Sequence, residues 1–206
     1  MKKHLLTALA LTALLSSACN DLKKPQEKDQ PQEATADTAV VYRDGTTAAG
    51  LADSAGNSVE SAWDMTKAKL ANETYEEVNL PEITVRGDDR YSVYGIEEKV
   101  LFDTDKAEIK PSATNALKQI GASISKRYGK NQVRVMGFAD SRGDKNYNRE
   151  LSEKRAEAVK TWLTKNAGIT ADRISVEPMG ETAPVASNAT ATGRQENRRV
   201  EIGVLK

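Results

Sequence analysis

Two residues of opposite charge, Asp140 and Arg155, are the side chains of this 206-residue chain best suited to bind a charged ligand. Asp140 follows an apolar run and lies in a glycine-containing loop, and Arg155 lies on the helix that the next residues predict. A carboxylate can bind a ligand ammonium, and a guanidinium can bind a ligand carboxylate through two parallel hydrogen bonds. The pair therefore predicts a receptor for a zwitterion, such as the charged end of an amino acid.

A strand and a helix must position this pair. Residues 133–138 alternate in a way that predicts a half-buried strand, whose C-terminal end places Asp140 in the loop. Asn148, Ser152, Arg155 and Val159 recur at helical spacing, which puts Asn148 and Arg155 on one face about two turns apart. The alternative is that Asp140 and Arg155 form only a mutual salt bridge, although a lone exposed pair contributes little to stability.

Strands alternate with helices through the second half of the chain, which predicts an α+β fold: a two-layer sandwich of a mixed β-sheet with helices on one face. The expected strands are residues 100–102, 133–138, 173–177 and 200–205. The expected helices run from Ser112 to Gly129 and from Asn148 to Asn166. A hairpin within residues 81–95, with its turn at Gly87, is expected to precede a domain spanning residues 96–206.

Several motifs in this region resemble one known family. They are the run from Gly137 to Arg155, Met179-Gly180-Glu181, Pro184, Asn188, Gly193-Arg194 and Asn197-Arg198-Arg199-Val200. Together they resemble the OmpA-like C-terminal domain, the peptidoglycan-binding module of bacterial envelope proteins, in the form found in peptidoglycan-associated lipoproteins. Ala139 stands where that family usually has threonine, and Pro178 where it often has glycine.

The resemblance implies a ligand and a set of contacts. The ligand is the diaminopimelate of a peptidoglycan stem peptide, whose side-chain end bears an ammonium and a carboxylate on one carbon. Asp140 would bind the ammonium and Arg155 the carboxylate, with further contacts from Asn148, Thr104 and Asp105. On this basis Asp140→Asn or Arg155→Ala is expected to abolish binding to purified sacculi and to leave the fold intact.

The first 80 residues predict an export signal and a tether. Residues 1–18 combine two lysines, an apolar run and small residues, as in a signal peptide of the lipoprotein type. Cys19, the only cysteine, resembles the lipidated cysteine of a lipobox, so we expect it to carry acyl chains such as palmitate; the alternative is an ordinary cleaved signal. Residues 19–50 are polar and proline-rich, as in a flexible linker, and residues 51–80 predict a weakly helical spacer.

The composition disfavours most enzyme classes. The only histidine, His4, lies in the predicted signal, so the mature chain lacks the Ser-His or Cys-His pair that activates a nucleophile, as well as the Cys and His ligands of zinc. Asp103, Asp105, Asp140 and Asp144 leave a glycosidase-like carboxylate pair formally open. With 30 acidic and 30 basic residues, no bulk charge points to nucleic acid. We therefore expect a non-catalytic protein without a cofactor.

These expectations combine into one hypothesis. The chain would be an outer-membrane lipoprotein whose periplasmic domain binds peptidoglycan and tethers the membrane to the wall. The competing hypothesis is a periplasmic scaffold that binds an envelope protein through the helix expected at residues 51–71 or through the hairpin, with wall binding secondary. Of the arginines near the end of the chain, Arg194, Arg198 and Arg199, at least one is expected to pair with an acid such as Glu181 or Glu196.

Overall fold

The computed structural model describes residues 63–65 and 68–206. The predicted signal (residues 1–18), Cys19, the predicted linker (residues 19–50) and most of the predicted spacer (residues 51–80) lie outside the described residues. The part of the spacer that is described contains no helix, and its regular structure is the short strand β1 (Ala71–Asn72). Within the described residues, no helix is both long and apolar enough to cross a bilayer.

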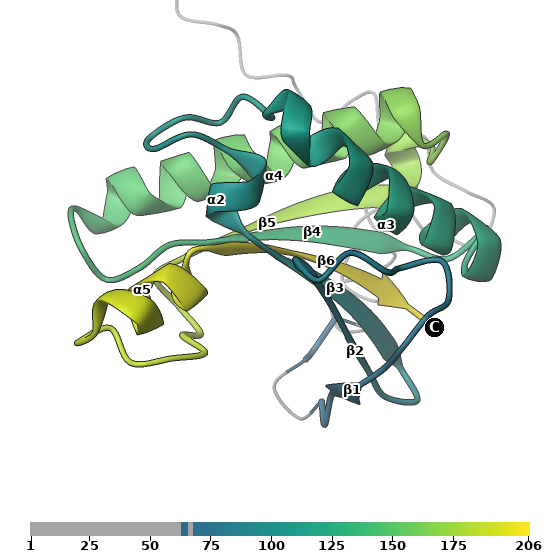
Figure 1. Cartoon of the computed structure of the whole chain (residues 1–206), viewed down its shortest axis with the longest axis horizontal. Helices are drawn as coiled ribbons and strands as arrows, with labels where there is room; N and C mark the ends of the chain where they lie inside the picture. The colour runs from purple at the N-terminus through teal and green to yellow at the C-terminus, as the bar shows by residue number, and fades with distance from the viewer. Residues whose placement is uncertain (1–62, 66–67) are drawn as a thin grey trace, which may run out of the picture. The chain divides into compact units, whose positions relative to one another are not determined.

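The strands of the described residues form one six-stranded mixed sheet, ordered β1-β2-β3-β6-β4-β5 (Figure 1). Only β4 and β5 among these strands pair in parallel, and the other neighbours are antiparallel. After β1, the strands are β2 (Ile83–Gly87), β3 (Tyr91–Glu97), β4 (Val133–Phe138), β5 (Ile174–Gly180) and β6 (Arg199–Leu205). β5 is an edge strand, which explains why it tolerates Pro178, a residue without a backbone N–H.

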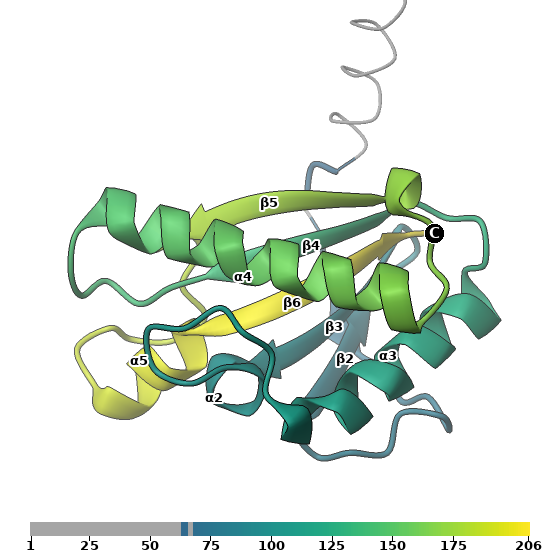
Figure 2. The same ribbon diagram turned by 90° about the horizontal axis from the view of Figure 1, so that it is seen from above.

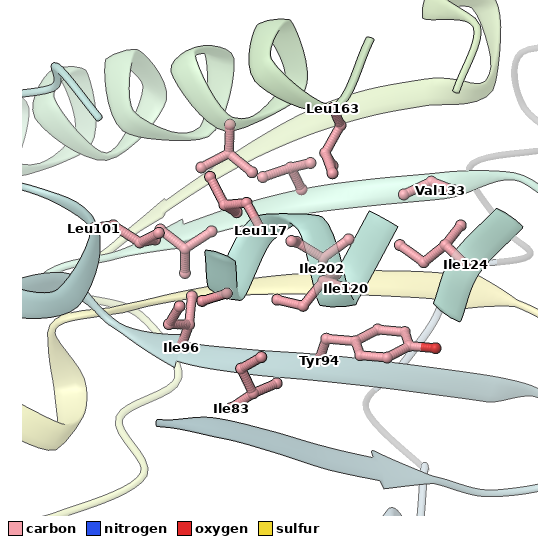
Figure 3. Close-up of a cluster of buried hydrophobic side chains, with 14 of the residues drawn as sticks. Ile83, Tyr94, Ile96, Leu101, Leu117, Ile120, Ile124, Val133, Leu163 and Ile202 are labelled. Carbon is pink, nitrogen blue, oxygen red and sulfur yellow. The ribbon is translucent and has the colours of Figure 1, made fainter. Parts of the chain in front are cut away.

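Two long helices, α3 (Thr114–Arg127) and α4 (Lys145–Asn166), lie across one face of this sheet (Figure 2). The shorter helices are α2 (Glu98–Leu101), α5 (Ala191–Asn197) and the 3₁₀ turns η1 (Pro111–Ala113) and η2 (Ala171–Arg173). The expected apolar side of α3, formed by Leu117, Ile120 and Ile124, is fully buried against the sheet (Figure 3). The predicted α+β sandwich with helices on one face is therefore confirmed.

The predicted strand at residues 100–102 is wrong, because residues 98–101 form the short helix α2. An apolar run of three residues does not distinguish a strand from a buried helical turn. The strand that precedes α2 is β3, which pairs with β6 residue for residue from Tyr91 to Glu97, while β4 pairs with β6 on its other side. The predicted hairpin, formed by β2 and β3, is therefore part of the six-stranded sheet and is not a separate unit before the domain.

Strand β4 is buried on both faces, whereas the alternation had predicted a half-buried strand. Val133 and Val135 face the core under the helices, and Arg134 lies on the opposite face. There Trp63 packs over Arg134, whose guanidinium carbon is 4.9 Å from the ring centroid, and stacks on Tyr91 at 6.1 Å. The segment that leads into β1 thus covers part of the face that the helices leave open.

The helix boundaries depend on capping side chains that the periodicity did not reveal. Helix α4 begins at Lys145, earlier than predicted, because the Asp144 carboxylate accepts hydrogen bonds from the backbone N–H groups of Asn146 (2.9 Å) and Tyr147 (3.0 Å). Helix α5 falls in a predicted loop and is capped by Thr190, whose hydroxyl accepts a hydrogen bond from the Gly193 N–H at 3.0 Å. Ser112 makes no capping bond, since it lies inside η1.

Candidate functional site

The candidate site lies at one end of the sheet, where the loop after β4 meets α2, α5 and the start of α4 (Figures 1 and 2). Asp140 is in that loop, and Arg155 projects from α4 on the face that the sequence predicted. Only 5% of the Asp140 surface and 4% of the Arg155 surface are exposed. Charges that are this strongly buried need partners, so the neighbours of each side chain define the site.

Two arginines hold the Asp140 carboxylate. Arg142 donates to it from its backbone N–H (2.8 Å to Oδ1) and from its guanidinium (Nη2 to Oδ2, 3.1 Å). Arg198 donates from Nη1 to Oδ2 at 2.5 Å. The Arg142 side chain is 65% exposed and the Arg198 side chain 24% exposed, so Arg142 is the partner that can leave Asp140 most easily.

The Arg155 guanidinium faces a backbone carbonyl and a carboxylate. Its Nε donates to the carbonyl oxygen of Lys106 at 2.9 Å, and its Nη2 lies 2.5 Å from Oε1 of Glu98. That Nη2–Oε1 contact is an ion pair without hydrogen-bond alignment, and the buried Nη2 has no hydrogen-bond partner among the described residues. Glu98 therefore compensates the charge of Arg155 inside the buried site.

Asp140 and Arg155 do not pair with each other, so the salt bridge considered as an alternative is not formed. They are connected through an intervening ion pair, because Glu98 Oε2 lies 3.0 Å from Nε of Arg198, the same arginine that binds Asp140. The order of charges is Asp140, Arg198, Glu98, Arg155. The acid and the base of the predicted receptor are thus brought to one place, with two further charges between them.

The other predicted site residues surround this pair. Asn148 is buried, and its Nδ2 donates to the carbonyl oxygens of Asp140 (3.2 Å) and Arg142 (2.8 Å), which holds the loop in place. Its Oδ1 makes no hydrogen bond to the described residues. Thr104 and Asp105 are exposed in a turn just before Lys106, the residue whose carbonyl receives Arg155, and Asp105 has a positive φ of 57°.

Sequence reasoning missed Glu98 and Arg198 as members of the site. At least one of Arg194, Arg198 and Arg199 was expected to pair with an acid such as Glu181 or Glu196. The acidic partners of Arg198 are instead Asp140 and Glu98. Glu181 pairs instead with Lys145, at 3.2 Å. The arginines at positions 194, 198 and 199 indicated that an acid lies nearby. That acid is Glu98 because β3 lies beside β6 and leads directly into α2, so its identity depends on strand pairing.

The remaining two arginines of the cluster have framework roles. Arg194 donates from Nη1 to the carbonyl oxygens of Asn188 (2.8 Å) and Ala189 (3.1 Å). Arg199 pairs with Glu201 at 2.8 Å and stacks over the Phe138 ring, with its guanidinium carbon 3.7 Å from the centroid. Both side chains therefore hold the segments that flank the site.

The pKa of Asp140 is below its ordinary value of 3.8, although burial alone would raise it, because hydrogen bonds from Arg142 and Arg198 favour the ionised form. Stabilisation by the ionised carboxylate is therefore fully present above pH 3.8 and is lost as the pH falls through the lower folded pKa. We expect the difference in free energy of unfolding between the wild type and Asp140→Asn to stay constant down to about pH 5 and to shrink below about pH 4. Urea titrations at several pH values test this, and a difference that does not change with pH would contradict it.

No cluster of three or more potential metal ligands occurs among residues 63–65 and 68–206. The hydrogen-bond donors to the Asp140 carboxylate come mainly from arginine side chains, which repel cations and favour the binding of anions or zwitterions.

Comparison with known proteins identifies the family of the domain that contains this site. Residues 101–198 match the model of the OmpA family. This part of the chain is an OmpA-like domain. It is similar to the probable lipoprotein YiaD of Escherichia coli K12 (39% identity, covering 53% of this chain and 49% of YiaD). It is equally similar to the outer-membrane lipoprotein YfiB of Pseudomonas aeruginosa (39% identity, covering 53% of this chain and 64% of YfiB).

Among solved structures, the OmpA-like domain is similar to the cell wall anchor of the T6SS from Pseudomonas aeruginosa. The two share 35% sequence identity with a TM-score of 0.55, over 60% of this chain and 87% of the other. The periplasmic domain of Helicobacter pylori MotB, at 22% identity and a TM-score of 0.56, shares the fold. The chain spans about half the length of YiaD, so the similarity concerns the domain and not the whole protein.

Proposed function

We propose that the OmpA-like domain binds peptidoglycan non-covalently, through the diaminopimelate of the stem peptide. The observation that carries this proposal is the convergence of a buried acid, Asp140, and a buried arginine, Arg155, at one end of the sheet without a salt bridge between them. The cell wall anchor and the envelope lipoproteins to which the chain is similar support the same assignment.

The contacts of the site suggest how each group would bind. The ligand ammonium replaces the exposed Arg142 guanidinium at Asp140, and the unused Oδ1 of Asn148 accepts a second hydrogen bond from it. The ligand carboxylate binds the Arg155 guanidinium. Thr104 and Asp105, in the exposed turn beside Arg155, contact the neighbouring part of the stem peptide. The site stabilises existing charges and requires no proton transfer, which fits a non-catalytic role.

The whole protein would use this domain as a tether. In this proposal Cys19 is acylated, residues 19–50 form a flexible linker, and the domain reaches the wall from the outer membrane. The scaffold hypothesis relied on residues 51–71 or on the hairpin, and most of residues 51–71 lie outside the described residues. Trp63, within that range, is only 6% exposed because it packs against Tyr91 and Arg134. No observation on the described residues favours that second function.

Co-sedimentation with purified sacculi that contain meso-diaminopimelate tests the proposal. We expect the full chain to sediment with the sacculi, and free meso-diaminopimelate to compete for it. Cadaverine, which keeps two amines but lacks both carboxylates, is the matched control and should not compete, because it offers nothing to Arg155. Sedimentation that persists in excess meso-diaminopimelate would contradict the assigned ligand, and absence of sedimentation would contradict wall binding itself.

A further inference from the structure

Glu98 occupies an unusual position between the two guanidinium groups of the site. It is the first residue of α2, and its backbone N–H donates to the carbonyl oxygen of Arg198 at 3.0 Å. Its side chain is 11% exposed, with Oε1 at 2.5 Å from Arg155 Nη2 and Oε2 at 3.0 Å from Arg198 Nε. A carboxylate is thus already present at the arginine that the ligand carboxylate would need.

The geometry of a guanidinium determines whether Arg155 can bind a ligand carboxylate while Glu98 is in this position. An arginine can bind a carboxylate with two parallel N–H groups only along an edge formed by Nε and Nη2 or by Nη1 and Nη2. Both edges include Nη2. In Arg155, Nε is used by the Lys106 carbonyl, and Nη2 is buried, faces Glu98 and lacks a well-aligned hydrogen bond. A ligand carboxylate therefore cannot bind Arg155 in a two-pronged way while Glu98 keeps its present position.

We propose that Glu98 is an intramolecular stand-in for the ligand carboxylate. In the free domain the Glu98 carboxylate occupies Arg155, and ligand binding must displace it. This inference rests on the proposed function of the same site. Displacement leaves Glu98 paired, because Oε2 already contacts Arg198 and a side-chain rotation can transfer the whole carboxylate to that arginine. The free domain keeps Arg155 and Arg198 neutralised, and the ligand pays an energetic cost for the exchange.

The stand-in role explains two features of the site. A buried guanidinium without an acidic partner would be strongly destabilising, so a site that is empty for part of its lifetime requires an internal carboxylate. The Glu98 carboxylate is also shared between two arginines, with Oε1 at Arg155 and Oε2 at Arg198, so it keeps one basic partner when a ligand takes the other.

Calorimetric titration of the full chain with meso-diaminopimelate tests the proposal through Glu98→Gln. This change removes the competing charge and keeps the size of the side chain. We expect the affinity to rise about tenfold, as when one charge-assisted contact no longer competes with the ligand. Glu157→Gln is the matched control, since Glu157 is exposed and pairs with Lys160 at 4.0 Å, and it should change the affinity less than about twofold.

A second variant covers the case in which Glu98→Gln does not fold. Glu98→Asp keeps the charge but shortens its reach to Arg155, so a smaller gain in affinity is expected. Equal or weaker binding by whichever variant is folded, as judged by thermal melting, would overturn the proposal and assign Glu98 a positioning role. If the wild type binds meso-diaminopimelate and the variants gain nothing, only this inference fails; if the wild type does not bind, the proposed function fails with it.

Discussion

Replacing Arg155 by lysine is expected to weaken binding to sacculi by at least about 30-fold. A hydrogen bond to a charged group contributes about 1.5–3 kcal/mol, and loss of one such bond, at about 2 kcal/mol, corresponds to roughly this factor. Lysine keeps the charge and can still approach Glu98, but it lacks the planar group that binds the Lys106 carbonyl and a ligand carboxylate together. Co-sedimentation over a range of sacculus concentrations measures the effect.

The matched control is Arg149→Lys, the same chemical change on an exposed position of the same helix. Its binding should equal that of the wild type. If Arg155→Lys binds as tightly as this control, then Arg155 does not act through a two-pronged contact and the assignment of the ligand carboxylate is wrong.

Burial also changes what alanine would do at this position. The sequence alone suggested that Arg155→Ala would remove binding and leave the fold intact. The structure leads to a different expectation, because removal of a buried guanidinium leaves the buried carboxylate of Glu98 with Arg198 as its single basic partner. Lysine, which preserves the charge, therefore separates binding from stability better than alanine does.

The sequence predicted the parts of the fold that have a long, regular hydrophobic period. The apolar face of α3 and the alternation of Val200, Ile202 and Val204 in β6 point to the core as expected. In α4 the same holds for Ala156, Val159 and Leu163, whereas Leu151, expected on the same side, is only partly buried. Short elements were not predicted, because α2 and α5 contain too few residues for a period to emerge. The burial of both faces of β4 depends on Trp63, a contact between residues far apart in the chain.

The residues of the candidate site likewise divide into those that local spacing predicted and those that depend on contacts between distant parts of the chain. Asp140, Asn148 and Arg155 lie within one loop–helix unit, so local spacing was sufficient to bring them together. Glu98 and Arg198 reach the site through the pairing of β3 with β6, which no local pattern encodes. The backbone carbonyl of Lys106 is invisible to any argument from side-chain type. The sequence therefore could not predict which groups contact Asp140 and Arg155 in the free domain.

The close approach of α4 to β4 provides the second large prediction. A Cβ atom added at Gly137 would lie 2.2 Å from the carbonyl oxygen of Ser152 and 2.9 Å from its carbonyl carbon. Both are backbone atoms of α4, so no side chain can rotate away to relieve the overlap, and the whole helix must move. We expect Gly137→Ala to lower the free energy of unfolding by about 3 kcal/mol, the upper end of the usual cost of overpacking.

The same substitution should also weaken wall binding, because the displaced helix carries Asn148 and Arg155, whereas Asp140 belongs to the loop that follows β4. Urea denaturation measures the stability, and co-sedimentation with sacculi under conditions where the variant is folded measures the binding. Gly129→Ala is the control, since its added Cβ would have as its nearest neighbour the Ser125 carbonyl oxygen at 3.4 Å, and it should be close to neutral in both measurements. Equal stability of the two variants would mean that α4 can shift away from β4 at little cost, and the proposed rigid placement of Arg155 opposite the Asp140 loop would then be wrong.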